Sequence, residues 1–340
     1  MSGDGVTEIH GRGEGGPGYG GSGTETWAVR ALDAVLERVA ETSAAVGDRF
    51  PLYADPDSGE WTTTGRGSWT GGCWAGLLWL RARRTGRPAD RELAVRTTAR
   101  LAPWVEADTA ARGLILWYGT ALADDPGSAR LRTAAAEACR AAYEPALGLV
   151  PWGSAFGGPR LLARPDGAPG TARLLALVDP AAATSHLATH LRLCLDHGTR
   201  RYDGPEAGWV PAPGPGPGWS RGRAWLHLAA ADAGPRSTRG PGMPSPLSLP
   251  SVPPADTDAP VDTSAAAVTA VALLRAGRRE AGTEVLRAVV RGHLRAGGRL
   301  VDGCYEAERG LAVRHELVWG TFFLAAGLAV TTGLAHPTEL

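Results

Sequence analysis

Two segments far apart in the chain place tryptophan beside glycine where a helix is expected to begin. They are Trp69-Thr-Gly-Gly-Cys-Trp74 and Trp219-Ser-Arg221-Gly-Arg-Ala-Trp225. Glycine allows a close approach to the backbone, and an indole offers a flat apolar face with one N–H donor. This combination is typical of a groove that stacks sugar rings, although the same tryptophans would also suit a core of packed helices. We take Trp69, Trp74 and Trp225 as candidate sugar-binding residues.

A carboxylate and a guanidinium in the same half of the chain could supply chemistry to such a groove. Asp179 follows the apolar run 174–178 and precedes Pro180, so it can cap a helix that begins at Pro180. In dry surroundings its pKa would rise, and it could act as a general acid. The two roles are compatible. Arg221 stands at a predicted helix start, where the helix dipole disfavours a cation, so a bound anion is the functional alternative to plain solvent exposure.

These residues need a scaffold, and the sequence predicts a helical one. From residue 26 onwards, apolar residues recur at helical spacing, and Gly, Pro or Asp separates the runs. Strands and helices do not alternate, which argues against an α/β fold. We expect one helix to begin at Trp27 and others at about 72–84, 90–105, 112–123, 127–143, 180–196, 221–232, 262–277, 279–296 and 316–332.

Two stretches interrupt the helical pattern. Residues 148–172 hold many Gly and Pro residues around Trp152, which predicts an irregular loop near a site. Residues 233–261 are rich in Pro, Gly and Ser and cannot form a regular helix. Helical runs resume after them with unchanged character, so we expect a single domain over residues 26–335 with 233–261 as a loop. The Gly-rich residues 1–25 predict a disordered tail.

The composition narrows the possible partners. The formal net charge is zero, with 35 basic and 35 acidic residues, which argues against nucleic acid or an anionic membrane. Lys, Asn and Gln are absent, so Arg, acidic, hydroxyl and aromatic side chains must bind any sugar hydroxyls. The four cysteines lack metal-ligand spacing and are expected to be small buried hydrophobes. No signal peptide or membrane span is evident, so we expect a cytoplasmic protein without metal or cofactor.

Four segments follow one another in an order typical of one enzyme family. They are Trp69-Thr-Gly-Gly-Cys-Trp-Ala-Gly-Leu-Leu-Trp79, Trp219-Ser-Arg-Gly-Arg-Ala-Trp225, Asp262-Thr-Ser-Ala-Ala-Ala267 and Leu317-Val-Trp-Gly-Thr-Phe-Phe-Leu324. They resemble, in turn, the family segments Trp-Thr-x-Gly-Phe-Trp-x-Gly-x-Leu-Trp, Trp-Ser-Arg-Gly-Gln-Ala-Trp, Asp-Ser-Ser-Ala-Ala-Ala and Ile-Trp-Gly-Asp-Tyr-Phe. The chain therefore resembles a divergent member of glycoside hydrolase family 88, the unsaturated glucuronyl hydrolases, and of the related unsaturated rhamnogalacturonyl hydrolases.

The resemblance implies an all-α fold, a toroid of six helical hairpins called an (α/α)6 barrel, with one or two helices shortened or lost. It also implies an unusual hydrolysis. An Asp protonates the double bond of a 4,5-unsaturated uronic acid at the non-reducing end of an oligosaccharide. Water then adds, and the resulting hemiketal collapses. By position, the resemblance makes Asp179 the catalytic carboxyl, Arg221 the ligand of the uronate carboxylate, and Trp152 and Trp225 sugar-binding residues.

The sequence departs from the family at a second essential carboxylate. The family's His-Asp-Leu-Gly-Phe segment corresponds to Ala110-Ala111-Arg112-Gly113-Leu114, so both the His and the Asp are replaced. A catalytically inactive sugar-binding or accessory protein on the same fold is therefore the alternative. A different enzyme on a helical toroid is a third hypothesis. His186, His190 and His197 have the only spacing that suggests a metal, with His186 and His190 at i and i+4, but packing or solvated histidines fit them better.

Overall fold

The computed structural model describes residues 24–232 and 250–340. The predicted tail, residues 1–25, lies outside the described residues except for its last two, which begin the first helix. The predicted loop at 233–261 is described only from residue 250 onwards. There it contains an isolated antiparallel bridge between Pro254 and Val261 and no helix.

Helices dominate the described residues. They are α1 (Thr24–Val46), α2 (Gly71–Thr85), α3 (Pro88–Ala99), α4 (Tyr118–Thr120), α5 (Pro126–Ala141), α6 (Thr171–Ala176), α7 (Pro180–Cys194), α8 (Gly204–Ala207), α9 (Ser220–Asp232), α10 (Thr263–Arg275), α11 (Arg279–His293) and α12 (Val318–Thr331). No described helix is both long and apolar enough to cross a membrane.

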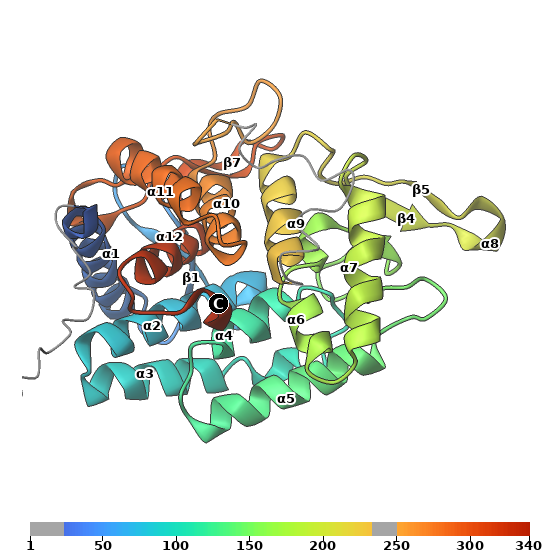
Figure 1. The fold of residues 1–340 in the computed structure, drawn as a ribbon, viewed down its shortest axis with the longest axis horizontal. Coiled ribbons are helices and arrows are strands. Elements are labelled where there is room, and N and C mark those ends of the chain that lie inside the picture. The colour runs from blue at the N-terminus through green and yellow to red at the C-terminus, as the bar shows by residue number, and fades with distance from the viewer. Residues whose placement is uncertain (1–23, 233–249) are drawn as a thin grey trace, which may run out of the picture.

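The helices fall into an inner and an outer set (Figure 1). Helix α2 packs on α12, α12 on α10, α10 on α9, and α9 on α6. Helix α6 packs on the π-helical turn η3 (Gly113–Trp117), which continues into α4 and contacts α2, so the series of contacts returns to its starting helix. Helices α1, α3, α5, α7 and α11 each pack on the outside of one or more of these elements.

Close backbone approach holds the inner set together at η3. A Cβ on Gly113 would lie 2.0 Å from the backbone nitrogen of Thr171, and one on Gly72 would lie 2.2 Å from the carbonyl oxygen of Ile115. Both contacts are shorter than any side chain allows, so glycine is required at these two positions. The expected helix at 112–123 is accordingly a π-helical turn followed by the short α4, because η3 is wedged between α2 and α6.

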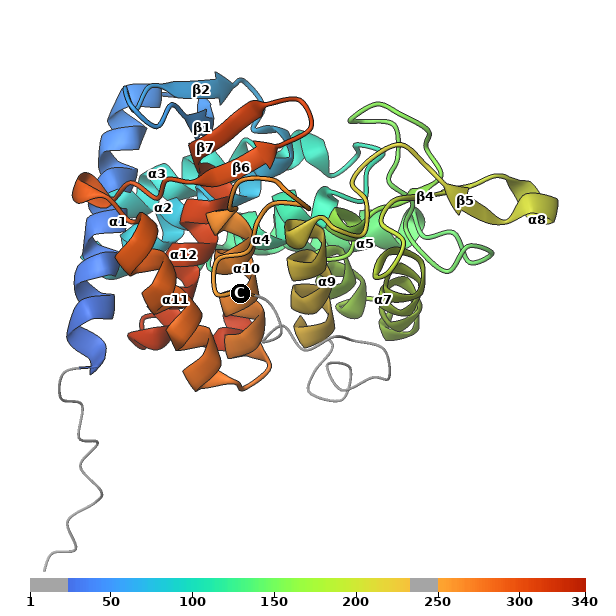
Figure 2. The ribbon, with the colours of Figure 1, turned by 90° about the horizontal axis from the view of Figure 1, so that it is seen from above.

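Two small antiparallel sheets correct the all-α expectation. One has the order β2-β1-β7-β6, from β1 (Phe50–Ala54), β2 (Trp61–Thr64), β6 (Gly303–Glu306) and β7 (Leu311–Leu317). The other has the order β3-β4-β5, from β3 (Leu162–Ala163), β4 (Arg200–Tyr202) and β5 (Trp209–Pro211). Figure 2 shows the first sheet at one end of the upright helices α10 and α12. Apart from β7, the strands have two to five residues, too few to give a clear alternating pattern in the sequence.

The main hydrophobic core lies between the inner helices. Its largest fully buried side chains include Trp79, Trp225, Trp319, Tyr118 and Phe322. All four cysteines are free and buried, as expected from their scattered positions. The stretch 148–172, expected to be irregular, is so up to residue 170 apart from β3 and a short 3-10 turn, η4 (Pro165–Gly167). Helix α6, which begins at Thr171, was not expected.

Candidate functional site

Three aromatic side chains gather where α2, β6 and α12 meet. The ring centroids of Trp69 and Trp319 are 4.7 Å apart, and that of Tyr305 lies 6.2 Å from Trp69 and 5.1 Å from Trp319. The indole N–H of Trp69 donates to the Tyr305 hydroxyl at 3.3 Å. Trp319 is fully buried, whereas Trp69 and Tyr305 are half-buried. The two half-buried rings are therefore the members of this cluster that a ligand could reach.

Arg221 supports this aromatic cluster from below. Its guanidinium carbon lies 5.4 Å from the centroid of Trp319 and 5.1 Å from that of Trp219. Its Nη1 donates to Asp262, to Ser264 and to the carbonyl of Cys304, and its Nη2 donates to the carbonyl of Tyr305. The residue is only 2% exposed. These contacts occupy most of its donors and tie the first turns of α9 and α10 to β6.

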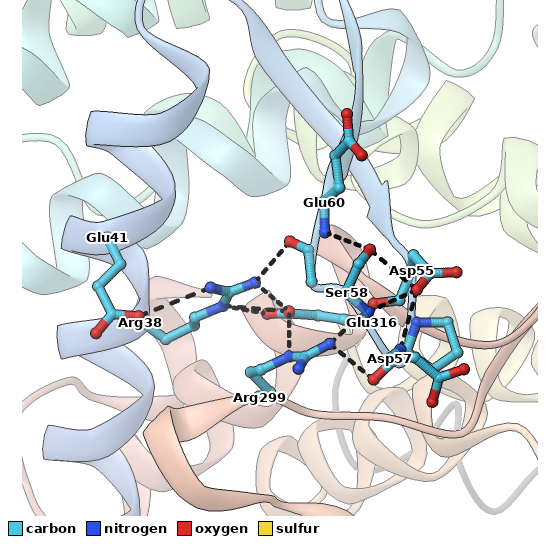
Figure 3. Close-up of polar contacts among 10 residues, drawn as sticks. Arg38, Glu41, Asp55, Asp57, Ser58, Glu60, Arg299 and Glu316 are labelled. Atoms are coloured by element: carbon cyan, nitrogen blue, oxygen red, sulfur yellow. Dashed lines mark hydrogen bonds and ion pairs between the residues drawn. The ribbon is translucent and has the colours of Figure 1, made fainter.

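A buried ion-pair cluster holds in place the sheet that carries Tyr305 (Figure 3). The Glu316 carboxylate on β7 is fully buried and accepts from Arg38 on α1 at 2.9 Å. Arg299 lies 3.9 Å from the same carboxylate and donates at 2.8 Å to the carbonyls of Asp55 and Pro56. Burial raises the pKa of Glu316, against the opposing effect of the two guanidinium groups. This cluster fixes β7, and through it β6, against α1 and the turn after β1.

A second group of side chains surrounds η4. Arg164 forms two parallel hydrogen bonds of 3.0 Å to the two carboxylate oxygens of Asp166. Its guanidinium carbon lies 4.2 Å from the centroid of Trp152. Burial acts to lower the pKa of Arg164, but the ion pair with Asp166 outweighs it and the net shift is upward. The planar fork of Arg, which matches a carboxylate and stacks on an indole, explains why these three side chains fit together.

Two buried histidines on α7 lie behind η4. The Val150 N–H donates to His186 Nδ1 at 3.1 Å, so His186 is neutral and its Nε2 donates to the carbonyl of Gly167 at 3.2 Å. His190 Nδ1 bonds to the carbonyl of His186, and the buried His190 Nε2 has no hydrogen-bond partner among the described residues. Burial lowers the pKa of His190 to about 4. Both rings are therefore neutral near pH 7, and they support η4 from the side of α7.

The two groups of side chains are linked through Tyr305 on β6 and through the packing of η4 on α9. The Tyr305 hydroxyl is near enough to Arg164 to act on its pKa, and η4 packs against α9, which carries Arg221. Together they combine half-buried aromatic rings, one guanidinium and one carboxylate whose side chains are 23% and 15% exposed, respectively. Among the described residues no group of three or more His, Cys, Asp or Glu side chains has the geometry of a metal site.

Comparison with solved structures matches this architecture to one group of enzymes. Unsaturated glucuronyl hydrolase from Bacillus sp. GL1 superimposes with a TM-score of 0.75 and 20% identity over 89% of this chain and 96% of that chain. An unsaturated glucuronyl hydrolase specific for heparin gives 0.74 at 18% identity, and one from Streptococcus agalactiae gives 0.74 at 16%. They cover 89% and 91% of this chain and 96% and 92% of their own chains.

This chain has the unsaturated glucuronyl hydrolase fold. Neither a family model nor a curated protein sequence matches it. The solved structures therefore support the helical toroid that the four sequence segments implied, although their sequences are only 16–20% identical to this chain.

Within this glucuronyl hydrolase fold, the predicted sugar-binding tryptophans occupy different environments. Trp69 belongs to the aromatic cluster at β6. Trp152 is 7% exposed, and the guanidinium of Arg164 lies over its ring. Trp74 and Trp225 are 4% and 1% exposed and lie in the main core, where Trp225 meets Phe323 edge to face at 5.3 Å. The contacts of Trp74 and Trp225 are those of helix packing.

Asp179 lies apart from the aromatic cluster. Its Oδ1 accepts from the Ala182 N–H at 2.9 Å, which caps α7, and its Oδ2 lies 2.5 Å from Arg140 on α5. The backbone hydrogen bond at the cap, with help from Arg140, holds the pKa of Asp179 below its usual range. Arg221 takes its contacts from α10 and β6 instead, so the structure does not bring these two predicted site residues together.

The positions that replace the second family carboxylate are closed. Ala110 and Ala111 are 1% and 0% exposed, and the Ala110 carbonyl accepts from the Thr171 hydroxyl at 2.6 Å. The Ala110 methyl lies 3.2 Å from where a Cβ on Gly167 would be, so these residues pack directly against η4. The site around Asp166 therefore has no second carboxylate from this segment.

Sequence reasoning missed Arg164 and Asp166. The signal was available in Arg164-Pro-Asp166-Gly, an acidic turn that follows a short apolar run and precedes an apolar helix. It was obscured because α6 is only six residues long and lies within a stretch rich in Gly and Pro. The next Asp along the chain, Asp179, has a more obvious helix-capping context.

Proposed function

We propose that this chain is a divergent hydrolase of the unsaturated glucuronyl type, acting on a small oligosaccharide with a 4,5-unsaturated uronic acid at its non-reducing end. The observation that carries the proposal is the carboxylate of Asp166, which is partly exposed and pairs with Arg164, whose guanidinium lies over Trp152 and within electrostatic reach of Tyr305. Half-buried aromatic rings suit sugar faces, and a lone carboxyl suits a reaction that needs one acid and base. The fold of the matched enzymes supports the same conclusion.

In the proposed reaction, Asp166 acts twice. Its carboxyl proton is transferred to one carbon of the double bond, and the neighbouring carbon becomes electron-deficient. Water adds to that carbon and returns a proton to the Asp166 carboxylate. The resulting hemiketal then opens and releases the neighbouring sugar. Each proton lost by the carboxyl is regained within one turnover, so the mechanism balances without a metal or cofactor.

We further propose that residues 26–335 form one domain of the six-hairpin type. The inner set α2, η3 with α4, α6, α9, α10 and α12 supports six inner positions, and α1, α3, α5, α7 and α11 support five outer ones. The segment between α9 and α10 falls where the sixth outer position would be. On this arrangement the first turns of α2, α9, α10 and α12 lie with η4 around the proposed sugar site.

The test is loss of double-bond absorbance in the ultraviolet, with unsaturated chondroitin and rhamnogalacturonan disaccharides as substrates. Asp179, the carboxyl predicted from the sequence, is the competing candidate for the acid. We expect turnover of at least one disaccharide, abolished in Asp166→Asn and retained in Asp179→Asn. The reverse pattern would restore Asp179 as the acid. No turnover across the panel would exclude a hydrolase of this type on these substrates.

A sugar-binding protein without turnover is the second candidate. It is favoured by one observation, the replacement of the family's second carboxylate by the buried Ala110 and Ala111. This candidate predicts that the same disaccharides quench tryptophan fluorescence in a saturable manner while their absorbance stays constant. Turnover that depends on Asp166 would exclude it.

A further inference from the structure

Arg164 is the guanidinium in the candidate site that a ligand could engage. Its side chain is 23% exposed, whereas that of Arg221 is 3% exposed. Arg164 uses Nε and Nη2 for Asp166, and among the described residues its Nη1 has no hydrogen-bond partner. Its guanidinium carbon lies 4.2 Å from the centroid of the Trp152 ring. Its guanidinium therefore presents N–H donors in a fixed orientation. In the structure, two of them bond to the carboxylate of Asp166, which belongs to the same turn.

The Arg164–Asp166 pair can open without disturbing the fold. The two residues are two positions apart, so their ion pair joins no distant elements. The pair of Arg221 and Asp262, by contrast, spans 41 residues and is buried on both sides. The pair is part-buried and local, so an incoming carboxylate can compete for its donors without breaking a contact between distant elements.

We propose that Arg164 is the residue that recognises the substrate carboxylate, and that Asp166 occupies its fork until the substrate displaces it. This inference rests on the proposed function and names the group that selects an acidic sugar. It assigns to Arg164 the role that the sequence had suggested for Arg221. In this exchange the guanidinium stays over Trp152, and the substrate carboxylate replaces that of Asp166 as its bidentate partner.

The exchange also prepares Asp166 for its chemistry. In the structure both carboxylate oxygens of Asp166 accept from Arg164. Substrate binding would release them from Arg164 and free the Asp166 carboxyl for the reaction. The other titratable groups near Asp166 are His190 and Cys194 on α7, with Arg200 near Cys194 and Tyr305 near Arg164. His190 is neutral near pH 7, and the cation that is hydrogen-bonded to Asp166 is Arg164.

The first test compares binding of an unsaturated chondroitin disaccharide with that of its uronate methyl ester, by calorimetry. Wild-type protein is expected to prefer the free acid. Arg164→Met should weaken binding of the acid roughly tenfold to a hundredfold, the usual range for hydrogen bonds to a charged group, and leave the ester nearly unchanged. Arg164→Lys should give an intermediate loss. Arg160→Met is the matched control, because Arg160 lies in the same loop and pairs with Asp108 and Glu144. Equal loss for acid and ester in Arg164→Met would overturn the proposal.

The second test changes Asp166, the carboxylate that competes with the substrate for Arg164. Asp166→Asn removes the carboxylate that occupies the fork, so it should bind the free acid several-fold more tightly than wild-type protein does. Binding of the free acid that is no tighter in Asp166→Asn than in wild-type protein would overturn the exchange. Both binding tests measure affinity, whereas loss of double-bond absorbance measures turnover. Binding that depends on Arg164 with no loss of absorbance would therefore refute the hydrolase and keep this inference, whereas turnover unaffected by Arg164→Met would refute the inference alone.

Discussion

Arg221 and Asp262, 41 residues apart in the chain, form an ion pair in which the side chains are 3% and 0% exposed. Asp262 also caps α10, accepting from the Ser264 N–H at 2.9 Å and from the Ser264 hydroxyl at 2.6 Å. The pair thus joins the start of α9 to the start of α10 and to β6. In a molecule built from helices with short connections, this single pair sets how three elements meet below Tyr305.

Removal of the Arg221 guanidinium should therefore be costly for stability. Arg221→Met leaves the Asp262 charge buried without its partner, and we expect a loss of about 3–5 kcal/mol in the free energy of unfolding, measured in urea. Arg309→Met is the control, because Arg309 pairs with Glu306 on the surface and should change stability by less than about 1 kcal/mol. A loss for Arg221→Met as small as that of the control would mean that the pair has no role in joining the helices.

His190 predicts how stability depends on pH. Its pKa falls from 6.5 to about 4 in the folded protein because the ring is buried. Between these values the unfolded chain binds more protons than the folded one, so stability falls as the pH falls from 6.5 to 4. The shift corresponds to about 3 kcal/mol at the lower end. Asp232 acts in the opposite direction over part of this range, since burial raises its pKa to about 6.

The variant His190→Leu isolates this contribution. It should lose less stability than wild-type protein between pH 6.5 and pH 4, by about 3 kcal/mol, in urea titrations at fixed pH. His197→Leu is the control, because His197 is exposed. If His190→Leu and wild-type protein lose stability in parallel, His190 is not buried in its neutral form.

The close approach at η3 gives a prediction about glycine. Gly113→Ala places a methyl group 2.0 Å from the Thr171 backbone nitrogen, so α6 must move away from η3. We expect thermal denaturation to show a protein that is severely destabilised or unfolded. Gly292→Ala is the matched change in α11, where nothing lies within 4 Å, and should stabilise slightly because Ala favours a helix. Equal melting temperatures for the two variants would contradict the described contact between η3 and α6.

Much of the helical scaffold could be predicted from the sequence because apolar residues recur at helical spacing and Gly, Pro or Asp separates the runs. Residues 180–196 and 279–296 were expected to be helical, and α7 and α11 begin where predicted, at Pro180 and Arg279. The sheets could not be predicted, since β3 has two residues and β6 four. Their pairing depends on contacts with residues far away in the chain, such as Tyr53 opposite Leu317. Local periodicity carries no trace of such contacts.

The site was harder to predict than the scaffold, for a physical reason. Sequence position alone does not tell how far a Trp is buried, and Trp69 is half-buried whereas Trp74, five residues later, lies in the core. An Asp that caps a helix and an Asp that lies beside a site can also both stand just before a helix, so the neighbouring residues do not distinguish them. Asp166 could be separated from Asp179 only once Trp152 and Arg164 were seen beside it.

Variants of Asp179 can distinguish a helix-capping role from a catalytic one. Its side chain accepts from the first turn of α7 and pairs with Arg140. Asn retains an oxygen that can cap, so Asp179→Asn should keep a melting temperature near that of wild-type protein and keep its turnover, whereas Asp179→Ala should melt at a lower temperature. Because the pKa of Asp179 is held low, its stabilising effect is fully present above its unfolded pKa and is lost only as the pH falls through the lowered folded value. Between pH 5 and pH 8, the stability of wild-type protein and that of Asp179→Asn should therefore depend on pH in the same way. A large loss of turnover in Asp179→Asn at an unchanged melting temperature would reinstate Asp179 as the acid.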